Sequence, residues 1–211
     1  MADQAQDPLL VALRLRYRSA MLLRRGENGL ALRVLGRAHQ VLNQAEDAGS
    51  VAALAVSGTL HLAAAISSAQ ARDHDAVKGS IAEAARIAEQ IGRDVPAVYW
   101  SAFGITNVAH FTVASEIEMG NLGQATRTGK SLRFPVGHPR ARVGRYHIEM
   151  ARAFAQMGKA PQAERHLHLA REAAPQQARY HPYVRDTIGV LVRRQRRAPE
   201  GLCALATWVG L

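Results

Sequence analysis

The side chains of this chain that could bind or react are mainly arginines and histidines at helical spacing. Arg145 and Arg152 are seven residues apart, so a helix through them places both on one face. Two guanidinium groups on one face could hold a carboxylate or a phosphate through forked hydrogen bonds. Asn107 and His110 form a second polar pair, and Arg16 is a third polar position. We predict that these five residues bind a ligand. The alternatives are solvated arginines and a hydrogen-bonded polar pair between helices.

The familiar catalytic and metal-binding motifs are not formed. The segment 129–131, Gly-Lys-Ser, resembles the end of a phosphate-binding loop, but the glycine needed five positions earlier is Gln124, and the preceding segment has helical character. His166 and His168 are two residues apart and therefore lie on different sides of a helix. Cys203 is the only cysteine, which excludes a disulfide and a multi-thiolate metal site, and we expect it to be buried. The sequence predicts no enzyme, no metal site and no cofactor.

These residues would be positioned by a repeated helical pattern with uneven spacing. Each of four segments has a turn residue, then a small residue five positions later, then large and small apolar residues further on. The turn residues are Gly26, Arg72, Gly120 and Gly158, separated by 46, 48 and 38 residues. This spacing exceeds the regular tetratricopeptide period of about 34 residues. The segment 147–175 nevertheless resembles a tetratricopeptide repeat closely, whereas the third segment departs from the pattern.

We therefore predict an all-α fold of stacked antiparallel helix hairpins, a tetratricopeptide-like right-handed solenoid, in a single domain over residues 1–211. The expected hairpin units and capping helices cover 8–48, 51–92, 97–134, 139–175 and 182–209. The third unit is expected to begin with a helix over 97–119, with an interruption at Gly104 left open. The first helix of each hairpin would line a concave groove, into which the five polar residues would point.

The composition favours a soluble helical protein with an uneven charge distribution. Hydrophobic residues make up 48% of the chain, yet no apolar run approaches the roughly 18 residues that a membrane span needs. The first ten residues lack the regions of a signal peptide, so we expect a cytoplasmic protein without a membrane partner. The net charge is +10, and residues 107–211 hold 16 Lys/Arg against 7 Asp/Glu, a surplus of +9. This surplus indicates either an acidic partner such as nucleic acid or a solvated arginine-rich surface.

Two phrases in the second half resemble one family of regulators. They are Phe103–His110, of sequence FGITNVAH, and Arg179–Arg185, of sequence RYHPYVR, which is followed by a basic helix and the ending LATWVGL. Both resemble the C-terminal regions of actinobacterial helix-turn-helix transcriptional regulators of the Xre type. The resemblance implies a sensor region that binds peptides or small signals or forms dimers. No helix-turn-helix signature precedes Pro8, so the resemblance does not extend to the DNA-binding domain of these regulators. Whether the chain binds DNA directly therefore stays open.

Our leading hypothesis is a non-catalytic binding module, the sensor and oligomerisation region of a transcriptional regulator, which recognises a peptide, protein or small-molecule signal in its groove. The alternative is a nucleic-acid-binding protein that uses the basic C-terminal half. That half includes the run Arg193, Arg194, Arg196 and Arg197. The apolar terminal helix, which contains Leu205, could cap the stack or pair with a second copy in a homodimer.

Overall fold

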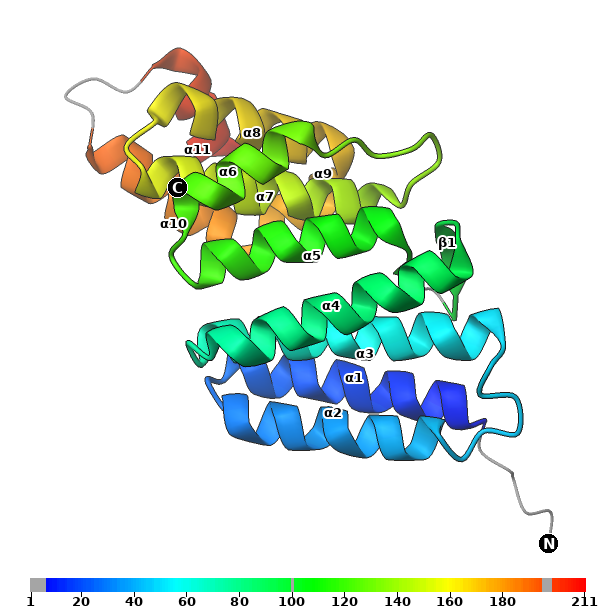
Figure 1. The fold of residues 1–211 in the computed structure, drawn as a ribbon. Coiled ribbons are helices and arrows are strands. Elements are labelled where there is room, and N and C mark those ends of the chain that lie inside the picture. The colour runs from blue at the N-terminus through cyan, green and yellow to red at the C-terminus, as the bar shows by residue number, and fades with distance from the viewer. Residues whose placement is uncertain (1–6, 100, 195–198) are drawn as a thin grey trace, which may run out of the picture. The chain divides into compact units, whose positions relative to one another are not determined.

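The computed structural model describes residues 7–99, 101–194 and 199–211. Within these ranges the chain is all-helical apart from one short two-stranded hairpin (Figure 1). The helices are α1 (Pro8–Arg24), α2 (Asn28–Leu42), α3 (Val51–Gln70), α4 (His74–Ile91), α5 (Ile105–Glu118), α6 (Leu122–Ser131), α7 (Arg140–Gln156), α8 (Ala160–Ala173), α9 (Pro175–Tyr180), α10 (Pro182–Arg193) and α11 (Glu200–Val209). The strands are β1 (Val95–Val98) and β2 (Ser101–Phe103), which pair antiparallel. The chain forms two compact units, Met1–Met119 and Gly120–Leu211.

The four turn residues of the repeat pattern share one backbone conformation. Gly26, Gly120 and Gly158 have φ values of 77°, 83° and 73°, and Arg72 has a φ of 63°. This left-handed conformation ends one helix and allows the next to begin, and it suits glycine because glycine has no Cβ. Arg72 adopts it without that advantage. The predicted antiparallel hairpins α1–α2, α3–α4 and α7–α8 each form around one of these turns.

The core of the first unit lies between α1, α2, α3 and α4. Its inward positions alternate large and small residues that are at most 2% exposed, namely Ala12, Leu13, Ala31, Leu35, Ala38, Leu60, Leu62, Ala65, Ala84 and Ile87. The small residues let the helices approach closely, and the large ones fill the space between them. By length and composition α3 could cross a membrane, but 56% of its apolar window is buried inside the structure. It is therefore the central core helix of this unit.

The expected helix over 97–119 is wrong in its first part, where the structure has the β1–β2 hairpin and α5 begins only at Ile105. Gly104 has a φ of 153°, and a Cβ there would lie 2.2 Å from the Asp94 Oδ1 atom. Asp94 in turn accepts hydrogen bonds from the Thr106 amide at 3.2 Å and the Thr106 hydroxyl at 2.5 Å. Because this carboxylate satisfies the first turn of α5 from outside the helix, the helix starts there and does not extend back through the hairpin.

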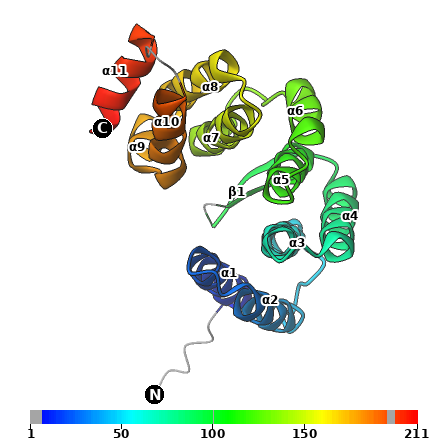
Figure 2. The same ribbon diagram turned by 90° about the vertical axis from the view of Figure 1, so that its left-hand side faces the viewer.

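The hairpin is inserted into the first unit against α3. Phe103 is 1% exposed, and its ring packs directly against Gly58 of α3. A Cβ atom added to Gly58 would lie only 2.0 Å from the Phe103 ring. The Thr59 and Ser101 hydroxyl oxygens are 3.5 Å apart across the same contact. Figure 2 shows the hairpin beside α3 and α5, with the helices seen nearly end-on. A glycine on α3 therefore makes room for an aromatic side chain from the hairpin.

A second boundary also differs from the expected one. Helix α2 ends at Leu42, whereas the sequence predicted helix to residue 48. Residues 43–50 form turns, and the Ser50 hydroxyl accepts a hydrogen bond from the Ala53 amide at 3.1 Å. Ser50 is therefore the N-cap of α3, and the connection between α2 and α3 is longer than predicted.

In the second unit, α6, α9, α10 and α11 surround the α7–α8 hairpin. Helix α9 was not expected: Pro175, the last residue of the expected fourth unit, begins this short helix, because proline is tolerated in a first helical turn. Helix α10 ends at Arg193, and Arg196 and Arg197 lie outside the described residues.

Helix α11 covers part of the second unit with its apolar face. Leu202 and Leu205 are fully buried, and Val209 is 4% exposed. These three residues take the inward face of α11, so Cys203 lies on its outer face and is exposed, contrary to the expectation that it would be buried. The terminal helix therefore packs onto α8, α9 and α10 of its own unit through this face.

Candidate binding site

Asn107 and His110, the polar pair predicted to line the concave groove, lie in the interior of the first unit. Asn107 and His110 are each 2% exposed. The Asn107 side-chain amide donates a hydrogen bond to the Ala102 carbonyl in β2. The His110 ring packs edge-on against Phe111 at 5.6 Å between ring centroids. Asn107 therefore attaches the hairpin to α5, and neither side chain lies on an open surface.

The hairpin also contacts the start of α1. The Tyr99 hydroxyl donates a hydrogen bond to the Asp7 carboxylate, and Asp7 accepts a second hydrogen bond from the Leu9 amide at 2.9 Å. The contact with Tyr99 lowers the pKa of Asp7 and raises the pKa of Tyr99. Arg16, the third predicted site residue, is half-buried on α1, with its guanidinium carbon 5.3 Å from the centre of the Tyr17 ring. The face predicted to be a groove in this unit is thus partly filled by the chain itself.

In the second unit, Arg145 and Arg152 lie on one side of α7 as predicted, and they share an aromatic partner. Their guanidinium carbons are 5.5 Å and 4.4 Å from the centre of the Tyr183 ring on α10. Arg145 also forms an ion pair with Glu149, at 2.6 Å between Nε and Oε1, and contacts the His181 ring. The side chain of Glu149 is only 8% exposed. Arg145 therefore already holds a carboxylate of its own chain.

Sequence reasoning missed the partners of these two arginines. Glu149 follows Arg145 by four residues, a spacing at which helical side chains meet, so this ion pair could have been found from the sequence. His181 and Tyr183 lie more than thirty residues away, and only the packing of α10 on α7 brings them to the pair. The five predicted residues thus fall into two groups, three in the first unit and two in the second.

Several other arginines of the second unit donate to the ends of helices. Arg140 donates to the carbonyls of Glu172 at 2.6 Å and Ala173 at 2.9 Å, which end α8. Arg185 donates to the carbonyl of Val209 at the end of α11, and Arg194 donates to the Ala155 carbonyl at 2.9 Å. The last carbonyls of a helix have no partner within the helix, so a guanidinium group satisfies them well.

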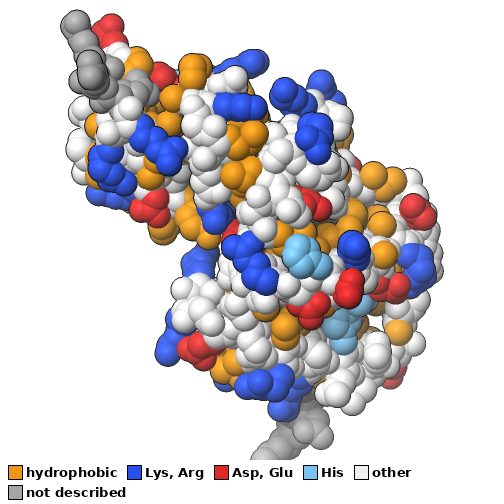
Figure 3. Space-filling model, turned by 60° about the vertical axis from the view of Figure 1, so that its left-hand side comes forward, with side chains coloured by type: hydrophobic (Ala, Val, Ile, Leu, Met, Phe, Trp, Pro, Cys, Tyr) orange, Lys and Arg blue, Asp and Glu red, His pale blue; other side chains and the backbone are white. Residues whose placement is uncertain are grey.

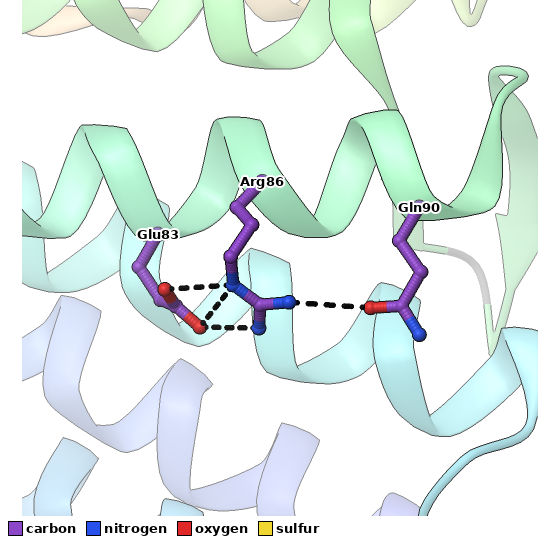
Figure 4. Close-up of polar contacts among 3 residues, drawn as sticks. All are labelled: Glu83, Arg86 and Gln90. Carbon is purple, nitrogen blue, oxygen red and sulfur yellow. Dashed lines mark hydrogen bonds and ion pairs between the residues drawn. The ribbon is translucent and has the colours of Figure 1, made fainter.

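Two pairs of histidines pack between neighbouring helices. His39 of α2 and His61 of α3 have ring centroids 4.4 Å apart, and burial lowers the pKa of His39 to about 4 and also lowers the pKa of His61. Glu83 of α4 acts in the opposite direction on both pKa values. Figure 4 shows that Glu83 is held by Arg86, which also reaches Gln90.

The second pair lies between α7 and α8. The Nδ1 atoms of His147 and His166 are 3.0 Å apart, and burial lowers the pKa of His166 to about 4. Burial also raises the pKa of the adjacent Tyr146 to about 12. Among the described residues, no group of three or more His, Cys, Asp or Glu side chains could hold a metal ion. At neutral pH His39 and His166 are therefore uncharged.

An open groove on the α1–α2 hairpin is the feature that sequence reasoning missed. It has a volume of about 520 Å³. Its aliphatic lining consists of Val11, Leu15, Val34 and Val41. The cationic lining consists of Arg18, Arg33 and Arg37, all of them exposed. Aliphatic residues four apart on α1 and seven apart on α2 are the signal that could have revealed this second apolar face.

Comparison of the chain with protein-family models, curated proteins and solved structures finds no match in any of the three.

Proposed function

We propose that this protein is a non-catalytic binding module, a tetratricopeptide-like helical repeat that serves as the sensor and oligomerisation region of a cytoplasmic transcriptional regulator. The four repeat turns with positive φ and the antiparallel hairpins around them support the repeat interpretation. Its ligand is a segment of a partner protein. The single observation that carries this proposal is the groove on α1–α2, where aliphatic side chains remain accessible between exposed arginines.

The groove is a better binding surface than the positions that the sequence favoured. Asn107 and His110 are buried, and Arg145 forms an ion pair with Glu149. The groove, in contrast, is bounded by two antiparallel helices whose outward faces are open. A groove between two helices with an aliphatic lining suits an amphipathic helix, which binds through apolar residues at every third or fourth position.

A titration with designed peptides tests this proposal. Three amphipathic peptides would share one apolar face and differ in their polar face, which would carry Glu, Gln or Lys. Backbone NMR signals of the labelled protein would report which residues each peptide perturbs. We expect at least one peptide to perturb α1 and α2 selectively, and we expect Val34→Asp to abolish the effect, because a buried carboxylate disfavours an apolar contact.

Val136→Asp is the matched control, because Val136 is fully exposed in the loop before α7 and far in sequence from the groove. It makes the same chemical change and should leave the titration unaltered. If none of the three peptides perturbs α1 or α2, the proposed binding function is wrong.

Nucleic-acid binding is the second candidate, supported by the 16 Lys/Arg against 5 Asp/Glu in residues 120–211. The structure reduces that support, because Arg140, Arg185 and Arg194 donate to carbonyls of their own unit. On the face drawn in Figure 3, basic side chains are spread between apolar, acidic and neutral ones. Phosphate contacts strengthen steeply as salt falls, so no binding of a short duplex at about 50 mM salt would exclude this candidate.

A further inference from the structure

We propose that the α1–α2 groove binds an acidic amphipathic α-helix of a partner protein. This inference rests on the proposed binding function and specifies the partner.

The charge of the groove comes from arginines that form no polar contact with the rest of the described chain. Within the described residues, Arg18, Arg33 and Arg37 form no hydrogen bond or ion pair. Each guanidinium group carries a fixed positive charge and five donors that match a carboxylate in a forked arrangement. Three such groups beside one groove favour a ligand with several carboxylates, and a neutral ligand would leave their charges uncompensated.

The apolar lining determines the rest of the ligand. Val11 and Leu15 on α1, and Val34 and Val41 on α2, offer only aliphatic contacts. Along α2, the groove extends from Arg33 to Val41, which corresponds to about 12 Å at a rise of about 1.5 Å per residue. A helix of about eight residues, a little over two turns, has that length. A phosphate backbone would satisfy the arginines but would leave the aliphatic lining in contact with water.

A second copy of the chain is a poor occupant of this face. A two-fold dimer through the groove would place the same patch on both sides, so three arginines would face three arginines. Like charges brought together at an interface disfavour association. An acidic helix has the opposite charge, and therefore gains from the arginines that repel a second copy.

The three peptides described above also test this inference on the whole chain. We expect the Glu peptide to bind at least about tenfold more tightly than the Lys peptide, and its affinity to fall several-fold as salt rises, because exposed charge pairs are screened. The double variant Arg33→Gln/Arg37→Gln should weaken binding of the Glu peptide about tenfold and leave the Gln peptide unaffected. The control Lys78→Gln/Arg93→Gln removes the same charge from exposed positions outside the groove and should change neither.

The outcomes separate this inference from the proposed function. If the Gln or Lys peptide binds α1–α2 as tightly as the Glu peptide, the groove is a binding site but not one for acidic partners. The same conclusion follows if Arg33→Gln/Arg37→Gln leaves the affinity unchanged while Val34→Asp abolishes binding. If light scattering shows a dimer that Val34→Asp dissociates, the occupant is a second copy, and the inference is overturned.

Discussion

The two units use their arginines in different ways. Residues 120–211 hold 16 Lys/Arg against 5 Asp/Glu, whereas residues 1–119 hold 11 against 12. Yet in the basic unit Arg140, Arg145 and Arg185 are joined to helix ends or to a carboxylate. In the nearly neutral unit, Arg33 and Arg37 line a groove and form no such contact in the described structure. The net charge of a unit therefore does not show where a ligand could bind. An arginine is available to a ligand only if its donors are not already bonded to carbonyls or carboxylates of the chain.

The histidine pairs extend the same comparison. Both pairs pack between neighbouring helices, and burial lowers the pKa of His39 and of His166 to about 4. In the first unit the Glu83 carboxylate partly offsets that effect on His39 and His61. In the second unit the nearby charge is Arg165, which lowers the pKa of His166 further. The same packing motif is therefore placed beside opposite charges in the two units.

Removing one arginine of each kind tests this difference between the units most directly. Arg145→Ala deletes the ion pair with Glu149, which is largely buried, so we expect a loss of about 2 kcal/mol in the free energy of unfolding. Arg33→Ala removes an exposed arginine without an ion pair, and should change the stability by less than about 0.5 kcal/mol. Urea unfolding monitored by circular dichroism would measure both.

Adding Glu149→Gln to Arg145→Ala should recover part of the stability, because a neutral amide needs no counter-charge. If Arg145→Ala and Arg33→Ala lowered the free energy of unfolding equally, the distinction between arginines with and without partners in the chain would be wrong.

The next effect is a loss of stability on mild acidification. His39 and His166 have a pKa of about 4 in the folded chain, against about 6.5 when unfolded. The unfolded chain therefore binds more protons between pH 6.5 and 4, so stability is full above that window and falls as the pH drops through it. Allowing for partial exposure of both rings, we expect a decrease on the order of 1 kcal/mol from each.

Urea midpoints measured across this pH range would test the prediction, with His39→Gln and His166→Gln each removing part of the decrease. Glu83→Gln should make the first unit more acid-sensitive, because it removes the charge that favours protonation of His39 and His61. A pH dependence unchanged by both histidine substitutions would show that other groups cause it.

The smallest predicted effect concerns the repeat turns. Arg72 in the first unit has a φ of 63°, a conformation that Gly158 adopts in the second unit without steric cost. Arg72→Gly should therefore raise the free energy of unfolding by about 0.5 kcal/mol, the relief of strain exceeding the added flexibility of the unfolded chain. Gly158→Arg should lower it, and thermal unfolding of both variants would show whether the two turns are equivalent. A loss of stability in Arg72→Gly would mean that the arginine side chain contributes more than its backbone conformation costs.

Much of the fold follows from local patterns that the sequence displays. The turn positions at Gly26, Gly120 and Gly158, the N-terminal cap at Asp7 and the helix hairpins depend on nearest neighbours along the chain. The prediction failed over 97–104, because the hairpin there is stabilised by Gly58 and Asn107, which contact it from other elements. No local propensity contains that information.

The candidate site was less accessible to sequence reasoning. The i, i+4 ion pair between Arg145 and Glu149 is local and could have been found, but the contacts of Arg145 with His181 and Tyr183 are not. The groove was missed because both helices of the first hairpin carry two apolar faces. One face of each helix is buried against α3, and only the fold shows that the other is left open.

The amino-acid sequence alone indicates that the chain is helical, where its main turns lie, and that it carries an excess of arginine. These properties depend on backbone preferences and on composition, which act over a few residues. Which arginines contact other parts of the chain, and which remain available to a ligand, depends on how the helices pack. A guanidinium group finds a carbonyl or a carboxylate only where another helix brings one beside it. Arg140 reaches the carbonyls that end α8, whereas Arg37 is exposed beside the groove.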